Sequence, residues 1–106
     1  MPLPDLDPEQ RRAALAKAGD ARRERAEIKR SLKAGETSLA VVLEAAAGSD
    51  ALAKMRVSEV LEALPAVGPI KAERLMEELR IARSRRIRGL GPRQRQALLD
   101  AFPQRP

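Results

Sequence analysis

The spacing of apolar residues predicts one long amphipathic helix at the start of the chain. Its apolar residues form only a thin stripe between charged positions, made of Leu15, Ala18, Ala21, Ile28 and Leu32. Asp7 can cap this helix, and Gln10 stands three residues later, as in a capping box. Good helix formers dominate up to about Lys33, and Gly35 can take the left-handed conformation that ends a helix.

Shorter and more apolar segments follow, and they predict the core of the domain. Thr37 or Ser38 can cap the first of them, and Ser58 the last. The predicted helices run over 38–47, 50–54 and 59–64. Between positions 37 and 64 two basic residues stand against four acidic ones, so we expect this region to keep its charges outside and to have no binding role.

Two Gly-Pro pairs mark the starts of the last two long helices. Pro65 ends the preceding segment, because the residue before a proline avoids helical geometry. Gly68-Pro69 then begins one helix, Ser84 is expected to cap a short helical turn, and Gly91-Pro92 begins the final helix. The free N–H groups at the start of a helix, together with its dipole, favour an anion, and Lys71 adds a positive charge at the first of these starts.

Composition favours an all-α fold. The chain has 106 residues, and much of its 43% hydrophobic content is Ala, with Phe102 as the single aromatic residue. Cores of Ala, Leu, Val and Ile pack closely through helices. We expect one structural unit in two parts. Residues 1–36 form a lead and a long basic helix that packs on the domain, and residues 37–106 form the helical domain with the binding motif.

Two missing residue types exclude much chemistry. The chain has no Cys and no His, which removes thiol nucleophiles, most zinc sites and most general-base chemistry near neutral pH. No apolar run approaches the length of a membrane span, and Met1-Pro2-Leu3-Pro4 is no signal peptide. We therefore expect a cytoplasmic protein without catalytic residues, metal, cofactor, small-molecule substrate or membrane partner.

Positive charge is concentrated in one short segment. Residues 80–95 contain seven Arg and no Asp or Glu, so this segment alone carries +7 while the whole chain carries +6. With a pI near 10.7, an anionic polymer is the favoured partner. We expect both Gly-Pro helix starts to share this arginine cluster. The candidate phosphate-binding residues are Gly68, Lys71, Arg85, Arg86, Arg88, Gly89, Gly91 and Arg93.

The long first helix carries a second group of cations, interleaved with Glu24 and Glu27. They are Arg22, Arg23, Arg25, Lys29 and Arg30. One interpretation is a solvated helix stabilised by pairs of opposite charge one turn apart. The other is a second basic face that rests on the domain and offers its charge to a nucleic-acid backbone. The sequence leaves both interpretations open.

Several of these motifs resemble a known family of DNA-binding proteins. The stretch Leu-Pro-x-Val-Gly-x-x-Lys-Ala over residues 64–72 is similar to the hairpin of helix-hairpin-helix and helix-two-turn-helix motifs. Together with residues 55–65 and Ser84-Arg85-Arg86-Ile87-Arg88-Gly89-Leu90-Gly91, it resembles the actinobacterial integration host factor family. Residues 7–11 and 21–27 extend the resemblance over nearly the whole chain.

This resemblance implies a helix-two-turn-helix fold of the S13-like type and a nucleoid-associated protein. Such a protein binds double-stranded DNA with little sequence preference, bends or compacts it, and influences supercoiling and recombination. The resemblance also implies a second DNA-facing surface around the N-terminal helix. The family's DNA contacts map onto Gly68, Lys71, Arg85, Arg86 and Arg88.

One position departs from the family pattern, which has Gly where this chain has Ala66. If the hairpin needs a positive φ at that residue, Ala costs about 1 kcal/mol or more. If Gly instead allows close approach to a phosphate, the methyl group loosens that contact. Ala66 is therefore left out of the predicted site.

Two other functions are weighed against DNA binding. A related hairpin occurs in a small-subunit ribosomal protein, which makes structured RNA the alternative partner, but Gln104-Arg105-Pro106 is not the long basic tail of such proteins. Helix-two-turn-helix DNA glycosylases use an N-terminal proline followed by glutamate, whereas Pro2 precedes Leu3, and their catalytic domain and zinc finger are lacking here. We predict a monomer that binds duplex DNA in the nucleoid.

Overall fold

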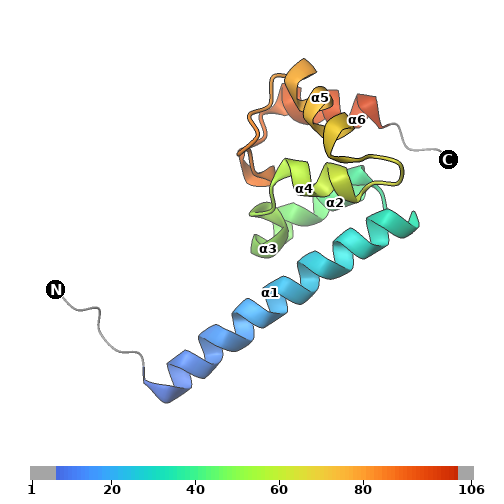
Figure 1. The fold of residues 1–106 in the computed structure, drawn as a ribbon. Coiled ribbons are helices and arrows are strands. Elements are labelled where there is room, and N and C mark those ends of the chain that lie inside the picture. The colour runs from blue at the N-terminus through green and yellow to red at the C-terminus, as the bar shows by residue number, and fades with distance from the viewer. Residues whose placement is uncertain (1–6, 103–106) are drawn as a thin grey trace.

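The computed structural model describes residues 7–102, and this part of the chain is all-α, as predicted (Figure 1). No strand occurs between residues 7 and 102, where the only β-like feature is an isolated antiparallel bridge between Arg56 and Arg86. The arguments that rested on Pro2 and on residues 104–106 lie outside the described residues.

The helices follow one another through short connections. In chain order they are α1 (Pro8–Ala34), α2 (Leu39–Ala45), α3 (Asp50–Ala53), α4 (Val57–Ala63), α5 (Pro69–Glu78) and α6 (Pro92–Ala101). Two short 3-10 helices, η1 (Ala46–Gly48) and η2 (Ile87–Gly89), complete the order. Helix α1 is a long rod whose C-terminal half packs against α3 and α4, while its N-terminal half extends beyond the domain (Figure 1).

Both predicted ends of α1 are confirmed. The carboxylate of Asp7 accepts the N–H of Gln10 at 2.7 Å, and the Gln10 side chain accepts the N–H of Asp7 at 3.2 Å, which is the capping box. At the other end Gly35 has a φ of 75°, and the N–H of Glu36 donates to the carbonyl of Ser31 at 2.9 Å. This backbone arrangement is a Schellman motif, in which glycine is favoured at the left-handed position.

The connection between α4 and α5 is a tight turn that holds Ala66 in a left-handed conformation. The N–H of Val67 donates to the carbonyl of Leu64 at 3.2 Å, and Ala66 has a φ of 63°. A hydrogen bond across four residues, Pro65 at the second position and a positive φ at the third are features of a type II turn. The structure therefore meets the condition under which Ala66 costs about 1 kcal/mol or more.

Helix α5 ends with a second non-glycine residue in the left-handed region. Arg80 has a φ of 57°. Its N–H donates to the carbonyl of Glu77 at 3.1 Å, and the N–H of Ile81 donates to the carbonyl of Met76 at 2.8 Å. These two bonds form a Schellman motif like the one at the end of α1, but with arginine at the position that favours glycine.

Two predicted helix caps are wrong. Helix α4 begins at Val57, one residue before Ser58, because the N–H of Val57 donates to the carbonyl of Arg85 at 2.9 Å. Ser84 lies in a turn, and η2 begins only at Ile87. Residues distant in sequence therefore fix the starts of both helices: Arg85 for α4, and Met55, whose carbonyl accepts the N–H of Ile87, for η2. Ser38 does cap α2, which ends at Ala45 and continues as η1 rather than running on to residue 47.

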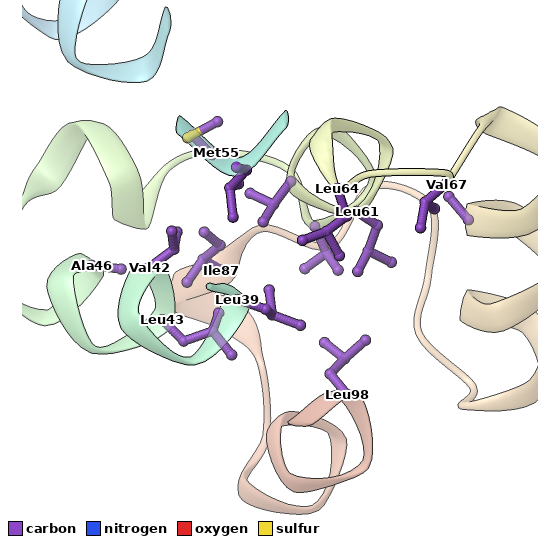
Figure 2. Close-up of a cluster of buried hydrophobic side chains, with 14 of the residues drawn as sticks. Leu39, Val42, Leu43, Ala46, Met55, Leu61, Leu64, Val67, Ile87 and Leu98 are labelled. Carbon is purple, nitrogen blue, oxygen red and sulfur yellow. The ribbon is translucent and has the colours of Figure 1, made fainter. Parts of the chain in front are cut away.

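The core contains apolar side chains from every helix of the described chain. Figure 2 shows part of it, with labelled residues of α2, α4 and α6 among others. Leu32 brings α1 onto it, and Val42, Leu61, Met76 and Leu98 are at most 1% exposed. Among residues 7–102, no polar or charged side chain is buried. The cations of the predicted site therefore all lie wholly or partly at the surface.

Candidate nucleic-acid interface

The segment between α5 and α6 folds into a turn that presents several arginines to solvent. Arg86 and Arg88 are exposed, and Arg85 is half-buried. The N–H of Ile87 donates to the carbonyl of Met55 at 2.9 Å, which ties this turn to the start of α4. We call residues 82–89 the arginine turn. Its end, η2, packs against α3 and η1.

Arg85 is positioned by a glycine at the end of the arginine turn. Its guanidinium donates from Nη1 to the carbonyl of Gly89 at 3.0 Å. A Cβ at Gly89 would lie 3.2 Å from the Cδ of Arg85, so a side chain there would make the arginine shift slightly. The buried Nε of Arg85 has no hydrogen-bond partner within the described chain. Because a guanidinium has five N–H donors, Arg85 keeps donors for a ligand.

Arg86 and Arg88 differ in how the fold uses them. Arg86 donates from Nη1 to the carbonyl of Lys54, the residue that caps the end of α3. Arg88 forms no hydrogen bond or ion pair through its side chain with residues 7–102. Arg86 therefore has a structural role as well as a charge, whereas Arg88 supplies charge alone.

The arginine turn encloses a shallow pocket of about 390 Å³. Three of its lining side chains carry a positive charge and none carries a negative one. The lining residues are Ala82, Ser84, Arg85, Arg86, Arg88 and Gly89. A concave surface with three guanidinium groups suits an oxyanion such as phosphate, because arginine forms strong, paired hydrogen bonds with phosphate oxygens.

Acidic residues neutralise little of the arginine-rich segment 80–95. Among the residues that the structure describes, only Arg83 of this segment forms an ion pair, with Glu73 at 3.5 Å. Arg93 is exposed in the first turn of α6 and has no such partner in residues 7–102. The predicted positive patch therefore keeps nearly all of its charge in the folded chain.

The two Gly-Pro helix starts meet the arginine-rich segment in different ways. Gln94, in the first turn of α6, donates from Nε2 to the carbonyl of Arg80 at 3.0 Å, and its Oε1 accepts the N–H of Gly91 at 3.1 Å. Gly68 and Lys71 instead follow the turn at the far end of α4 (Figure 1). Pro69 lines a pocket with Arg56 and Arg83, so the first start meets the edge of the segment, and a shared arginine cluster stays a prediction.

The length of α4 separates the hairpin from the arginine turn. The first residue of α4 is bonded to the arginine turn, and its last residue leads into the hairpin. Seven residues at 1.5 Å each give a separation of about 10 Å. The backbone of Gly68 has an ordinary φ of −93°, and no atom lies within 4 Å of a Cβ placed there. The fold itself does not require glycine at this position.

The second basic face on α1 is partly neutralised. Three of its five cations have acidic partners, and Lys29 links α1 to α4 at 3.7 Å. A hydrogen bond with Arg30, and then its charge, lower the pKa of Glu27, while Glu27 raises the pKa of Arg30. Within residues 7–102, Arg22 and Arg25 form no ion pair. The pairs are Arg23–Asp20, Lys29–Glu59, Arg30–Glu27 and Arg30–Glu36.

Sequence reasoning gave no role to three arginines that lie in or beside the arginine turn. Arg80 and Arg83 belong to the arginine-rich segment and were counted there without a role. Arg56 is placed opposite Arg86 by the antiparallel bridge, a pairing for which the sequence gives no local signal. In the described part of the chain, no cluster of acidic residues is placed to hold a metal ion, and no helix is long and apolar enough to cross a membrane.

Comparisons with known proteins find a family model, curated relatives and a solved structure that are similar to this chain. A family model described as the S13-like H2TH domain matches residues 32–102. The chain is 58% identical over 102 residues to an integration host factor of Mycobacterium tuberculosis (strain ATCC 25618 / H37Rv), covering 96% of this chain and 97% of that protein. It is 52% identical over 102 residues to one of Streptomyces coelicolor (strain ATCC BAA-471 / A3(2) / M145), covering 96% and 95%. A solved structure of sIHF bound to an 8 bp palindromic DNA is similar with a TM-score of 0.79 and 47% identity, covering 82% of this chain and 98% of that chain.

Proposed function

The chain belongs to the integration host factor family, with an S13-like H2TH domain over residues 32–102, and we propose that it is a nucleoid-associated protein that binds double-stranded DNA. The resemblance found in the sequence is thereby confirmed. A solved relative is bound to DNA, and the exposed arginines of this chain are placed to take the same kind of partner.

The observation that carries this proposal is the arginine-rich segment that stays charged after folding. Seven arginines and no acidic residue lie within residues 80–95, and only Arg83 has an ion-pair partner in the described chain. Duplex DNA gains its affinity for proteins largely from such contacts with phosphates, which release bound counterions. Short turns and helix starts reach phosphates and carry little information about base sequence. We therefore propose weak sequence preference.

We propose that the hairpin and the arginine turn contact the same duplex at two points. Helix α4 holds them about 10 Å apart, a distance comparable to the width of a groove of B-DNA, which is about 6 Å for the minor and about 12 Å for the major groove. Gly68 and Lys71 then approach one backbone while Arg85, Arg86 and Arg88 bind another. Contacts on two backbones favour a bent or compacted duplex.

We propose different roles for the two parts of the chain. Residues 37–106 are the DNA-binding domain, and residues 1–36 are a lead and a long basic helix. Helix α1 packs on the domain and offers Arg22 and Arg25 as a weaker second face. We propose that one monomer in the nucleoid provides both surfaces. We further propose that the protein acts by binding and not by catalysis, in keeping with a chain that has no His or Cys.

A fluorescence-anisotropy titration with a short duplex of mixed sequence tests the proposal. If about five phosphates are neutralised, log K should fall with log salt with a slope of roughly −4 to −5, and a slope near −1 would remove the patch as the main contact. Replacing Arg85, Arg86 and Arg88 together with Ala should abolish binding while the protein stays helical. Competition with duplex RNA of equal length tests the alternative, and a preference for RNA would overturn the assignment.

A single substitution can test, in the same assay, how the charge of one arginine affects DNA binding without disturbing the fold. Arg85 and Arg86 also hold the backbone, so the cleanest variant is Arg88→Glu, which changes an exposed side chain without internal bonds in the described chain. Arg12→Glu makes the same change of charge at an exposed position near the start of α1. We expect Arg88→Glu to weaken binding far more than Arg12→Glu. Equal losses would show that net charge alone governs affinity.

A further inference from the structure

The antiparallel bridge places two arginines directly opposite each other. The bridge pairs Arg56, just before α4, with Arg86 in the arginine turn. The backbone N–H groups of Val57 and Ile87, one residue beyond each arginine, donate across the bridge at 2.9 Å. The arginines themselves exchange no backbone hydrogen bond, so they form the closer kind of antiparallel pair, with Cα atoms about 4.5 Å apart and side chains on one face.

This pairing sets two like charges side by side, and no carboxylate lies within ion-pair distance of either one in the described chain. Like charges directly opposite each other on neighbouring strands are destabilising. Both arginines are exposed, and neither forms an ion pair with an acidic residue in the described chain. The Arg86 guanidinium is held in place by its bond to the carbonyl of Lys54, so it cannot swing away to relieve the repulsion without losing that bond.

The two arginines also join two neighbouring pockets. Arg86 lines the pocket of the arginine turn, of about 390 Å³. Arg56 lines a second pocket of about 350 Å³ together with Ser58 and Arg83, between α4 and α5. Glu62 and Glu73 line the second pocket too, so its charges balance, whereas the pocket of the arginine turn has only cationic side chains. A phosphate that contacts Arg56 is therefore expected on the side that faces Arg86, away from the two carboxylates.

We propose that Arg56 and Arg86 clamp a single phosphate of the DNA backbone between them. This inference rests on the proposed DNA-binding function and adds Arg56 to the site, within a region from which the sequence predicted no binding. A phosphate between the two guanidinium groups removes the repulsion and takes paired hydrogen bonds from both. Planar guanidinium groups suit this role better than lysine, which presents a single ammonium group.

Three variants test the clamp with the same duplex, titrated between about 50 and 200 mM salt. Arg56→Ala should weaken binding on the order of tenfold, as expected for loss of a charged hydrogen-bonded contact. The salt slope should become less negative by about 0.9, because one phosphate loses its partner. Arg86→Ala should also weaken binding. The double variant should lose less than the product of the two single losses, because both side chains hold the same phosphate.

Stability measurements on the free protein separate the clamp from a structural effect. Arg56→Ala should leave the thermal midpoint unchanged or raise it, most clearly at low salt, because the repulsion is removed. Arg86→Ala should lower the midpoint, because the carbonyl of Lys54 loses its donor. Arg56→Lys keeps the charge and should recover only part of the affinity. Full recovery with lysine would show a general charge effect and would overturn the clamp.

Arg12→Ala is the matched control, with the same loss of charge at a distant exposed position. Wild-type affinity for Arg56→Ala, a loss no larger than that of Arg12→Ala, or strictly additive losses in the double variant would each overturn the clamp. If Arg56→Ala binds normally while Arg88→Glu does not, the clamp fails and the proposed function stands. If both variants bind as the wild type does, the arginine turn is not the contact surface either, and if the wild type itself does not bind the duplex, the proposed function fails.

Discussion

The hairpin turn leads to a sharp prediction about stability, because the fold holds Ala66 where a glycine is favoured. Ala66→Gly should stabilise the protein. The residue occupies the third position of the type II turn with a φ of 63°. Its backbone conformation is strained for any residue with a Cβ, and glycine removes that strain without altering the hydrogen bond from Val67 to Leu64.

The expected size of the effect follows from two opposing terms. The left-handed conformation costs an L-residue about 1–2 kcal/mol, which glycine avoids. Glycine also gives the unfolded chain more freedom, which takes back about 0.4–1 kcal/mol. The net stabilisation is therefore about 0.5–1 kcal/mol. For a domain of this size 1 kcal/mol corresponds to about 4 °C, so the thermal midpoint should rise by about 2–4 °C.

The assay is thermal and urea unfolding followed by far-ultraviolet circular dichroism. Gly35→Ala is the matched control, because Gly35 has a φ of 75° and no atom lies within 4 Å of a Cβ placed there. The control makes the reverse change in the same backbone region without a steric clash. It should destabilise the protein by about the amount that Ala66→Gly stabilises it.

A lower midpoint for Ala66→Gly would refute this reasoning. Glycine destabilises a position with an ordinary negative φ, so a loss would show that residue 66 is not left-handed in solution. If Gly35→Ala destabilises as expected while Ala66→Gly has no effect, the backbone of the hairpin turn is not strained at Ala66. Only the strain assigned to this turn would then be wrong.

Three further substitutions test neighbouring positions by unfolding and by DNA titration. Gly68→Ala should change stability by less than about 1 kcal/mol, because a gain of about 0.4–1 kcal/mol through the unfolded chain opposes the preference for glycine over alanine at the N-cap of α5, yet it should weaken binding if a phosphate approaches there. Gly89→Ala should shift the Arg85 side chain slightly and weaken DNA binding slightly, with little change in the unfolding midpoint; unchanged affinity would contradict the role of that contact. Arg80→Gly should raise stability by about 0.5–1 kcal/mol while weakening DNA binding, and a loss of stability would contradict the strain assigned to its φ of 57°.

Local signals in the sequence were sufficient to predict much of the fold. The capping box of Asp7 and Gln10, the left-handed Gly35 and both Gly-Pro helix starts depend on residues close together in the chain, and the structure has all of them. Ser58 failed as a cap because a hydrogen bond from a distant segment, between Val57 and Arg85, fixes the start of α4. Tertiary pairing overrode a local preference at that point.

The candidate site was less accessible to sequence reasoning for the same reason. The charge of residues 80–95 is visible in the composition of the segment, and folding leaves it nearly unneutralised. The opposition of Arg56 and Arg86 depends on a bridge between distant segments, which neither arginine reveals in its local sequence. The partners that neutralise Lys29 and Arg30 are partly non-local too, and they favour a structural role for that portion of α1.

Arg80 shows how a binding surface can oppose stability. It takes the left-handed position at the end of α5, where glycine is the favoured residue, and it begins the arginine-rich segment. Strained backbone positions tend to occur at functional sites, where the surrounding structure holds them. Here the buried Met76 and Ile81 on either side of Arg80 supply that support, through the hydrogen bond between them.

The part of α1 that extends beyond the domain affects how the protein behaves in solution. The radius of gyration is 16.1 Å, and the extents are 48 × 32 × 24 Å, whereas a compact chain of this length has a radius of about 13 Å. A monomer of this shape diffuses more slowly than a sphere of equal mass, and it elutes early from a gel-filtration column calibrated with globular standards. An apparent mass near that of a dimer is therefore expected from a single chain, and light scattering, which measures mass independently of shape, should return 11.6 kDa.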